Sequence, residues 1–135
     1  ILKFWGQHEN VFVTSPEAFS LVPFLSTADI MISDASSAVL EFAAIGKPVI
    51  VCKFLKLRWN YRGIFSFRFK QRMSSDFNFY SNFAFIADDF SQLTTHLNAL
   101  STFQFNPEQK KFITKMIGSL DGNASKRIVD YLEEN

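Results

Sequence analysis

Short apolar runs separated by polar turns organise the first half of the chain. Residues 28–33 and 48–52 are short and mostly apolar, which is typical of parallel strands covered on both faces. The stretch at residues 10–14 and the run at residues 82–87 are predicted as two further short strands. Connections of 10 to 15 residues between such strands indicate βαβ units in a parallel sheet.

Helical spacing alternates with these runs. We predict short helices at residues 20–25, with Ser20 as the cap, and 37–45, which Gly46 ends, and longer ones after Asp89, after Asn106 and over residues 124–133. Residues 53–82 show no clean period and are expected to form a long irregular excursion. The predicted fold class is therefore α/β, a Rossmann-like sheet of three or four parallel strands flanked by helices.

Composition adds limits to this prediction. The 135 residues, 47% hydrophobic and 20% charged, fit one ordinary globular domain spanning residues 1–135. No apolar run approaches a membrane span and no signal peptide is visible, so we expect a cytoplasmic protein. The single Cys52 is expected to be a buried strand thiol, and neither a metal nor a cofactor is expected. Because the chain begins at Ile1 within a pattern, we expect it to be a fragment of a longer protein.

The charge is unevenly distributed. Eight of the 14 basic residues and none of the 13 acidic ones fall between Lys47 and Ser75, interleaved with aromatic residues. Such a segment attracts phosphates, whether in a nucleotide, an anionic polymer, a lipid surface or a nucleic acid. A solvated loop with its aromatic side chains turned inward is the alternative. Without a recognised nucleic-acid-binding module, nucleic acid is not an expected partner.

The turn after residues 28–33 carries Asp34, Ser36 and Ser37 where a helix begins. In open α/β sheets ligands bind beyond the carboxyl ends of the strands, and a helix start offers unpaired N–H groups to an anion. The turn is therefore a candidate seat for a diphosphate. An ordinary helix cap followed by a first turn would need the same residue types.

Glu41 is the one charged residue in a helix predicted to be buried, and it lies four residues after Ser37, on the same face. A ribose with its paired hydroxyl groups is one candidate partner for the carboxylate; interaction with the helix dipole or a structural salt bridge is the alternative. His8 and His96 lack plausible catalytic partners, so we expect structural roles for both.

Three separated motifs resemble the CDP-glycerol glycerophosphotransferase family, which includes teichoic-acid polymerases and primases. Residues 61–65, Tyr-Arg-Gly-Ile-Phe, resemble its Arg-Gly-Phe-Tyr loop, and residues 121–125, Asp-Gly-Asn-Ala-Ser, its Asp-Gly-Lys-Ala-Ser motif. The first motif, Asp-x-x-Ile-Thr-Asp-Tyr-Ser-Ser with a following acidic residue and Lys/Arg-Pro, is matched by Asp29, Ile32, Ser33, Asp34, Ser36, Ser37, Glu41, Lys47 and Pro48.

The resemblance implies the C-terminal, donor-binding half of a two-domain GT-B transferase that moves glycerol phosphate from CDP-glycerol to a lipid-linked or polymeric acceptor in envelope-polymer synthesis. It implies that Asp34, Ser36 and Ser37 face the donor diphosphate, Glu41 its ribose and Arg62 a phosphate. The family's two catalytic histidines have no counterpart here, so no catalytic residue is assigned and the chain alone is expected to be inactive. The missing N-terminal domain would be a partner.

Departures from the family pattern keep two other functions open. Ala35 stands where the family usually has Tyr, and Ile64 where it has Phe. A UDP-linked glycosyltransferase or epimerase donor domain is one alternative. The other is a non-catalytic phosphate- or membrane-binding module acting through the segment from Lys53 to Arg72, which would place the protein peripherally at the inner face of the cell membrane.

Overall fold

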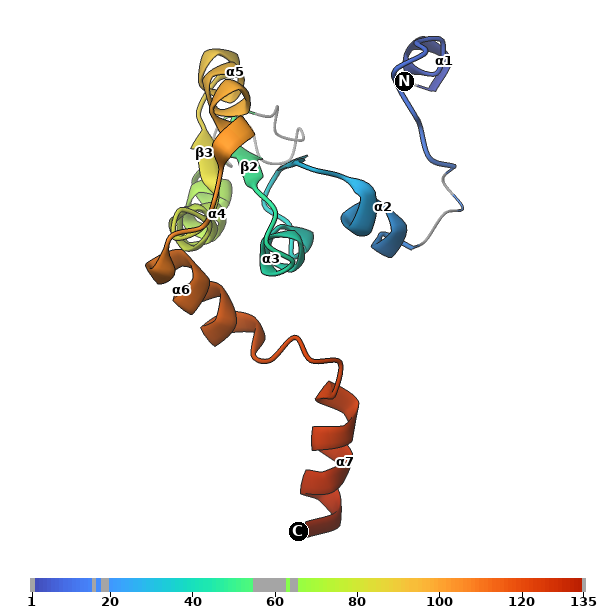
Figure 1. The fold of residues 1–135 in the computed structure, drawn as a ribbon. Coiled ribbons are helices and arrows are strands. Elements are labelled where there is room, and N and C mark those ends of the chain that lie inside the picture. The colour runs from blue at the N-terminus through green and yellow to red at the C-terminus, as the bar shows by residue number, and fades with distance from the viewer. Residues whose placement is uncertain (1, 16, 18–19, 55–62, 64–65, 135) are drawn as a thin grey trace.

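A computed structural model describes residues 2–15, 17, 20–54, 63 and 66–134. At its centre lies a parallel sheet of three strands in the order β1-β2-β3 (Figure 1). The strands are β1 (Met31–Ser33), β2 (Val49–Cys52) and β3 (Phe85–Ala87). The helices are α1 (Leu2–Trp5), α2 (Val22–Thr27), α3 (Ala38–Ala44), α4 (Ser66–Tyr80), α5 (Phe90–Ala99), α6 (Pro107–Ile117) and α7 (Ala124–Glu134), with a 3-10 turn at Leu100–Thr102. The predicted α/β class is confirmed.

The central strand β2 is buried on both faces, as its unbroken apolar sequence predicts. Val49 and Val51 point to one side, into a core shared with α3, the end of α4 and α6. Ile50 points to the other side, where it joins Ala87 and the apolar face of α5. Helices therefore cover the sheet from both sides, which is the layered arrangement expected of a doubly wound fold.

Most of the predicted elements form close to the expected positions. Helix α3 begins after Ser37, and Gly46 follows it with a φ of +85°, a left-handed conformation that favours glycine. Asp89 caps α5 by accepting a hydrogen bond from the Gln92 N–H, and Asn106 opens α6 in a reciprocal capping box. Local chemistry was sufficient to fix these helix starts.

Three expectations about local structure are wrong. Residues 10–14 form no strand: Phe12 is 82% exposed, and β1 lies at the edge of the sheet without the additional neighbour that such a strand needs. The N-cap of α2 is Leu21 rather than Ser20, with no side-chain cap, although Pro23 does occupy the first turn. Residues 66–80 form the long helix α4 and are not irregular.

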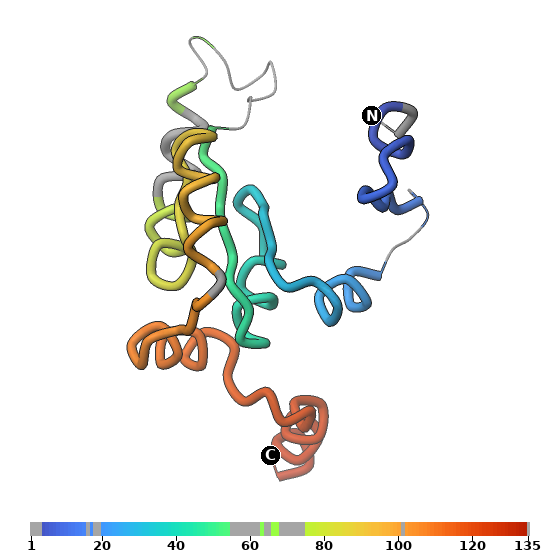
Figure 2. The backbone as a smooth tube through the Cα atoms, turned by 45° about the horizontal axis from the view of Figure 1, so that its top comes forward, coloured from blue at the N-terminus to red at the C-terminus, as the bar shows by residue number. Residues whose placement is uncertain are grey.

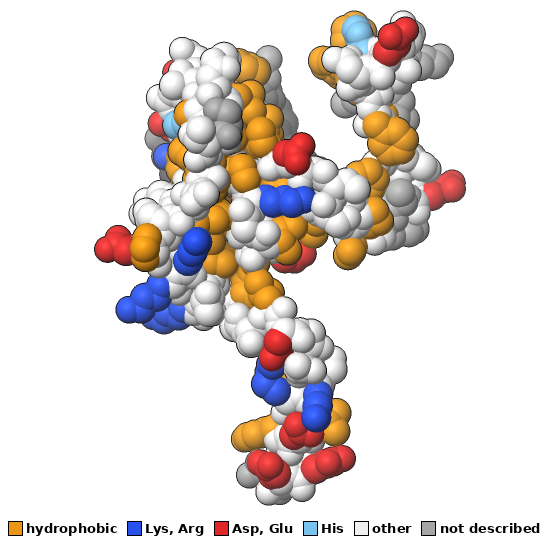
Figure 3. Space-filling model, viewed as in Figure 1, with side chains coloured by type: hydrophobic (Ala, Val, Ile, Leu, Met, Phe, Trp, Pro, Cys, Tyr) orange, Lys and Arg blue, Asp and Glu red, His pale blue; other side chains and the backbone are white. Residues whose placement is uncertain are grey.

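Both ends of the chain extend away from the sheet (Figures 1 and 2). The N-terminal arm carries exposed apolar side chains such as Phe4 and Phe12, and α7 exposes Ile128 and Leu132 (Figure 3). The predicted apolar face of α7 thus exists, but no described residue of α7 is buried. Within the described residues, the buried core is formed by the sheet, by helices α3 to α6 and by the connecting residues Phe83 and Phe105, and Leu25 of α2 packs against it.

Lys47 ties α2 to the start of β2. Its ammonium donates hydrogen bonds to the carbonyl oxygens of Leu25, Ser26 and Ala28 at 3.1, 2.7 and 2.6 Å, and lies 5.6 Å from the centre of the Phe42 ring. Unpaired carbonyl groups at a helix end attract a cation, so this contact closes α2. Lys47 was predicted to be part of the phosphate-attracting segment. Its ammonium instead binds the end of α2, beside the amino ends of the strands and not their carboxyl ends.

Replacing this side chain, Lys47→Met, should lower the free energy of unfolding by about 2 kcal/mol, because charge-assisted hydrogen bonds at a half-buried site are lost. Urea denaturation followed by circular dichroism measures the change. Lys126→Met, on the exposed helix α7, is the matched control and should change stability by less than about 0.5 kcal/mol. Equal effects of both substitutions would contradict a stabilising role for the Lys47 contacts.

Candidate functional site at the carboxyl edge of the sheet

The three parallel strands deliver polar residues to a single edge of the sheet. Asp34 follows β1, Lys53 follows β2 and Asp88 follows β3. The Lys53 ammonium lies 3.5 Å from an Asp88 carboxylate oxygen and 5.2 Å from the centre of the Phe77 ring. Its positive charge is therefore partly compensated within the protein. This edge is where open α/β sheets bind their ligands.

An open depression of about 360 Å³ lies at this edge, between the ends of β1 and β2. Its lining comes from Ile32, Ser33, Asp34 and Cys52. Burial of Cys52, together with the nearby carboxylate of Asp34, raises the pKa of the thiol. The thiol is thus held in its neutral form, which makes it a poor nucleophile.

The turn between β1 and α3 begins at Asp34, which lines this depression. The first helical hydrogen bonds run from the Val39 N–H to the Ser36 oxygen and from the Leu40 N–H to the Ser37 oxygen, both at 3.1 Å. Within the described residues, the N–H groups of residues 35–38 have no acceptor, and the Ser37 side chain makes no capping bond. Ser37 is exposed and Ser36 is half-buried, so ligands have access to the turn.

Tyr80, the last residue of α4, contacts this turn. Its hydroxyl donates a hydrogen bond of 3.1 Å to the Ser36 carbonyl oxygen. The ring is 8% exposed and packs against Phe79 and Phe83. Burial raises the pKa of the Tyr80 phenol, and the carboxylates of Asp76 and Asp34 raise it further, so the hydroxyl keeps its proton at neutral pH.

Glu41 lies on α3 as predicted, but it is exposed, while the helix buries Val39, Phe42 and Ala43. The expectation of a buried carboxylate in need of a partner is therefore wrong, because the helix turns this position away from the core. Exposure leaves the carboxylate accessible to a ligand. Its proposed contact with a ribose stays a prediction.

Part of the predicted site falls outside the described residues. Arg62 is not described, nor are Lys56 and Arg58 of the basic segment. The predicted surface between Lys53 and Arg72 is therefore known from the structure only in part, through Lys53 and the backbone of α4.

Both histidines lie apart from the turn. The Nε2 atom of His96 lies 3.1 Å from the Ile86 carbonyl oxygen, and its ring packs against Phe85. His8 is exposed on the N-terminal arm, among the rings of Phe4 and Trp5. These contacts are those of structural side chains.

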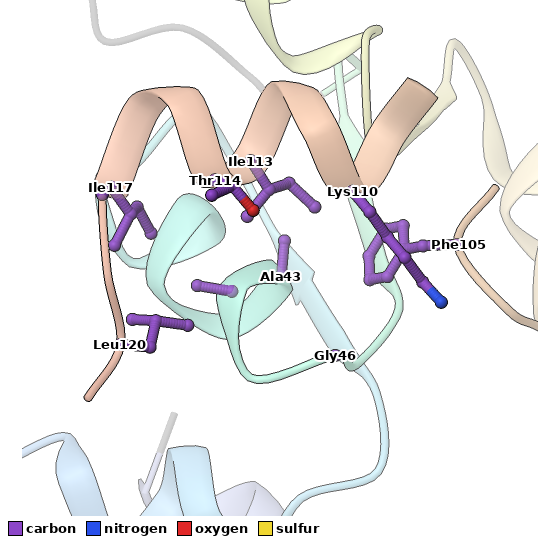
Figure 4. A pocket seen from close by; sticks show the side chains of 10 residues that line it. Ala43, Gly46, Phe105, Lys110, Ile113, Thr114, Ile117 and Leu120 are labelled. Atoms are coloured by element: carbon purple, nitrogen blue, oxygen red, sulfur yellow. The ribbon is translucent and has the colours of Figure 1, made fainter. Parts of the chain in front are cut away.

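A second cavity lies at the opposite end of α3, where that helix meets α6 (Figure 4). It measures about 270 Å³ and its lining is mostly apolar, with Ile113 and Leu120 pointing toward Ala43. Lys110 and Thr114 supply the only polar side chains of this lining. A cavity so poor in donors does not suit a diphosphate, which favours the edge at Ser36 and Ser37.

Among the described residues, His, Cys, Asp and Glu side chains form no group able to hold a metal ion. No helix in the described part of the chain is both long and apolar enough to cross a membrane.

The chain matches a family model over residues 5–134, that of CDP-glycerol:poly(glycerophosphate) glycerophosphotransferases. It belongs to this family. No curated protein and no solved structure matches the chain. A glycerophosphotransferase-type function therefore follows from the family, and the predicted family resemblance is confirmed.

The sequence prediction placed Lys53 in the basic segment of this glycerophosphotransferase family member, apart from the turn, and did not include Tyr80. The rule that the residue after each parallel strand reaches the ligand edge would have found Lys53. Tyr80 stands at a spacing of three and four residues with Phe69, Met73 and Phe77, a helical signal that would have indicated α4. No sequence signal links the end of that helix to Ser36.

The single thiol gives a direct test of this geometry. Because the pKa of Cys52 is raised, alkylation by iodoacetamide should be slow at pH 7 and should accelerate only above the pH at which an ordinary thiol ionises. Asp34→Asn removes one of the two causes, so the onset should move to lower pH while burial keeps the rate low. An unchanged pH profile for Asp34→Asn would contradict the closeness of the two side chains. Asp121→Asn, remote from Cys52 in sequence and in contact with Arg127, is the control.

Proposed function

We propose that this chain binds CDP-glycerol, or a related nucleotide-diphosphate donor, for transfer of glycerol phosphate to a lipid-linked or polymeric acceptor in envelope-polymer synthesis. The observation that carries the proposal is the family match over residues 5–134. The open turn at the carboxyl edge of the sheet supports it, since its N–H groups lack acceptors within the described residues.

In this proposal the diphosphate lies against the N–H groups and hydroxyls of Ser36 and Ser37. Asp34 would also face the diphosphate, as the resemblance implies; because a carboxylate only accepts hydrogen bonds, it would bind a hydroxyl group of the donor there. The ribose would reach Glu41, which is exposed on the same helix, and Arg62 would bind a phosphate through its two-pronged guanidinium.

The reaction would be an in-line displacement at the β-phosphorus. The acceptor hydroxyl oxygen forms the new bond, the bond from the β-phosphorus to the bridging oxygen breaks, and CMP leaves with that electron pair. Amide groups at the turn would stabilise the charge that develops on the phosphoryl oxygens. We assign no catalytic residue to this chain, so the proton of the acceptor passes to a base elsewhere in the complete enzyme, and the chain alone binds without turnover. The N-terminal domain of that enzyme would supply the facing wall.

Two alternatives keep specific support. A UDP-linked donor would use the same turn, because the diphosphate is common to both nucleotides. A phosphate- or membrane-binding module would use the segment from Lys53 to Arg72, whose sequence holds no acidic residue. The protein would then be peripheral at the inner face of the membrane.

Calorimetric titration of the chain separates these functions. CDP and CDP-glycerol should bind, and UDP and UDP-glucose should bind at least about tenfold more weakly if the site prefers cytidine. Preference for uridine would replace the proposal with the nucleotide-sugar alternative. Absence of nucleotide binding, together with binding to vesicles containing phosphatidylglycerol, would leave only the membrane module.

Removing a single amide tests the turn. Ser37 has a φ of −59°, which proline adopts, so Ser37→Pro should fold while deleting one N–H group. We expect its Kd for CDP to rise by about tenfold or more, since a hydrogen bond to a charged group is lost. Ser37→Ala keeps the N–H group and is the matched control, with a smaller loss. Unchanged affinity in Ser37→Pro, with folding verified by circular dichroism, would remove the turn from the mechanism.

A further inference from the structure

We propose that Tyr80 is a positioning residue that aims the Ser37 N–H group at the donor diphosphate by holding the Ser36 carbonyl group on the opposite side of the same peptide plane. The inference rests on the proposed function, because it concerns how the donor-binding turn is held. The hydroxyl of Tyr80 donates to the Ser36 oxygen at 3.1 Å, and it comes from α4, a helix 44 residues away in the chain.

Because the peptide unit is planar, this contact also fixes the direction of the neighbouring N–H group. The Ser36 carbonyl and the Ser37 N–H belong to one peptide unit, which is trans because the described residues contain no cis peptide bond. In a planar trans peptide the C=O and N–H bonds point in opposite directions. A carbonyl held toward Tyr80 therefore places the Ser37 N–H on the side away from Tyr80.

Two donors share this carbonyl oxygen. The Val39 N–H also bonds to it, at 3.1 Å, as the first hydrogen bond of α3. A carbonyl oxygen accepts two hydrogen bonds, so both are compatible. The helical bond alone leaves the peptide able to tilt about the chain direction, as helix ends commonly do, whereas a second donor from another element limits that motion.

Tyr80 is well suited to this task. Its ring is held by edge-to-face contacts with Phe79 and Phe83, whose centroids lie 5.5 and 6.0 Å away. Phe83 in turn is 1% exposed and stacks on Phe112 of α6. The hydroxyl therefore sits on a rigid aromatic cluster, and it points to a backbone group that carries no sequence-specific chemistry of its own. A buried hydroxyl needs a partner in any case, so the effect on ligand affinity is what separates a positioning role from a structural one.

The test compares Tyr80→Phe with the native chain. This variant removes one oxygen and keeps the ring, so the fold should persist. We expect the Kd for CDP and for inorganic pyrophosphate to rise about three- to tenfold, the range expected from one hydrogen bond. Phe103→Leu is the control: its ring packs against Phe85 and Phe105 and not among the ring contacts that hold Tyr80, so it should lower thermal stability and leave both Kd values unchanged.

A double-mutant cycle isolates the proposed route. With Ser37→Pro present there is no N–H to aim, so adding Tyr80→Phe should cause no further loss of affinity. In NMR spectra, addition of pyrophosphate should move the Ser37 amide signal of the native chain and move it less in Tyr80→Phe.

The outcomes separate the two proposals. Native binding of CDP with equal affinity in Tyr80→Phe would overturn the role of Tyr80 and leave the proposed function standing. Equal losses from Tyr80→Phe with and without Ser37→Pro would also overturn it, because the hydroxyl would then act elsewhere. Failure of the native chain to bind CDP, CDP-glycerol or pyrophosphate would instead overturn the proposed function, and the inference with it.

Discussion

The parallel hydrogen bonds that β2 makes to β1 on one side and to β3 on the other bring three carboxyl ends to one edge of the sheet. This pairing is possible because β2 is apolar on both faces and is covered from both sides, by α3, α4 and α6 on one and α5 on the other. Ile50 and Val51 are fully buried on opposite faces of the sheet. A shift of β2 by one residue would move each side chain to the opposite face, so the register is fixed. The register of the site follows from that burial.

The electrostatics of this edge differ from those of a phosphate site built on cations. Lys53 is the described basic residue that follows a strand here, and Asp88 and the Phe77 ring share its charge. Asp34 adds a negative charge nearby. Attraction for a diphosphate would then come mainly from oriented amide groups at the turn, whose strength depends on direction. In such a site, diphosphate binding would depend more on the direction of the backbone N–H groups at Ser36 and Ser37 than on any single side chain. The hydrogen bond from Tyr80 to this backbone would then affect binding.

Sequence patterns located most of the elements and the turn itself. The apolar runs gave β1 and β2 within a few residues, and the caps Asp89 and Asn106 gave the starts of α5 and α6, because these signals act over one turn of chain. Residues 10–14 have the composition of a strand, yet they are unpaired, because a strand forms only where a neighbouring strand is available to pair with it. Helix α4 was not predicted because basic residues interrupt its aromatic positions, so the helical spacing is hard to recognise in the sequence. The resemblance rested on three motifs, at residues 29–48, 61–65 and 121–125, and the family match over residues 5–134 confirms it.

The sequence by itself determined the class of fold, the family and the residues of the turn after β1, since each depends on neighbouring residues or on a short motif. Only the tertiary structure decided which charges reach the ligand edge. In the folded chain Glu41 is exposed, Lys47 binds the carbonyl groups at the end of α2, and Lys53 forms a salt bridge with Asp88. The tertiary structure also brought the Tyr80 hydroxyl to the Ser36 carbonyl group across 44 residues of chain. Contacts of this kind depend on how helices pack against both faces of the sheet, and no local pattern in the chain encodes that distance or direction.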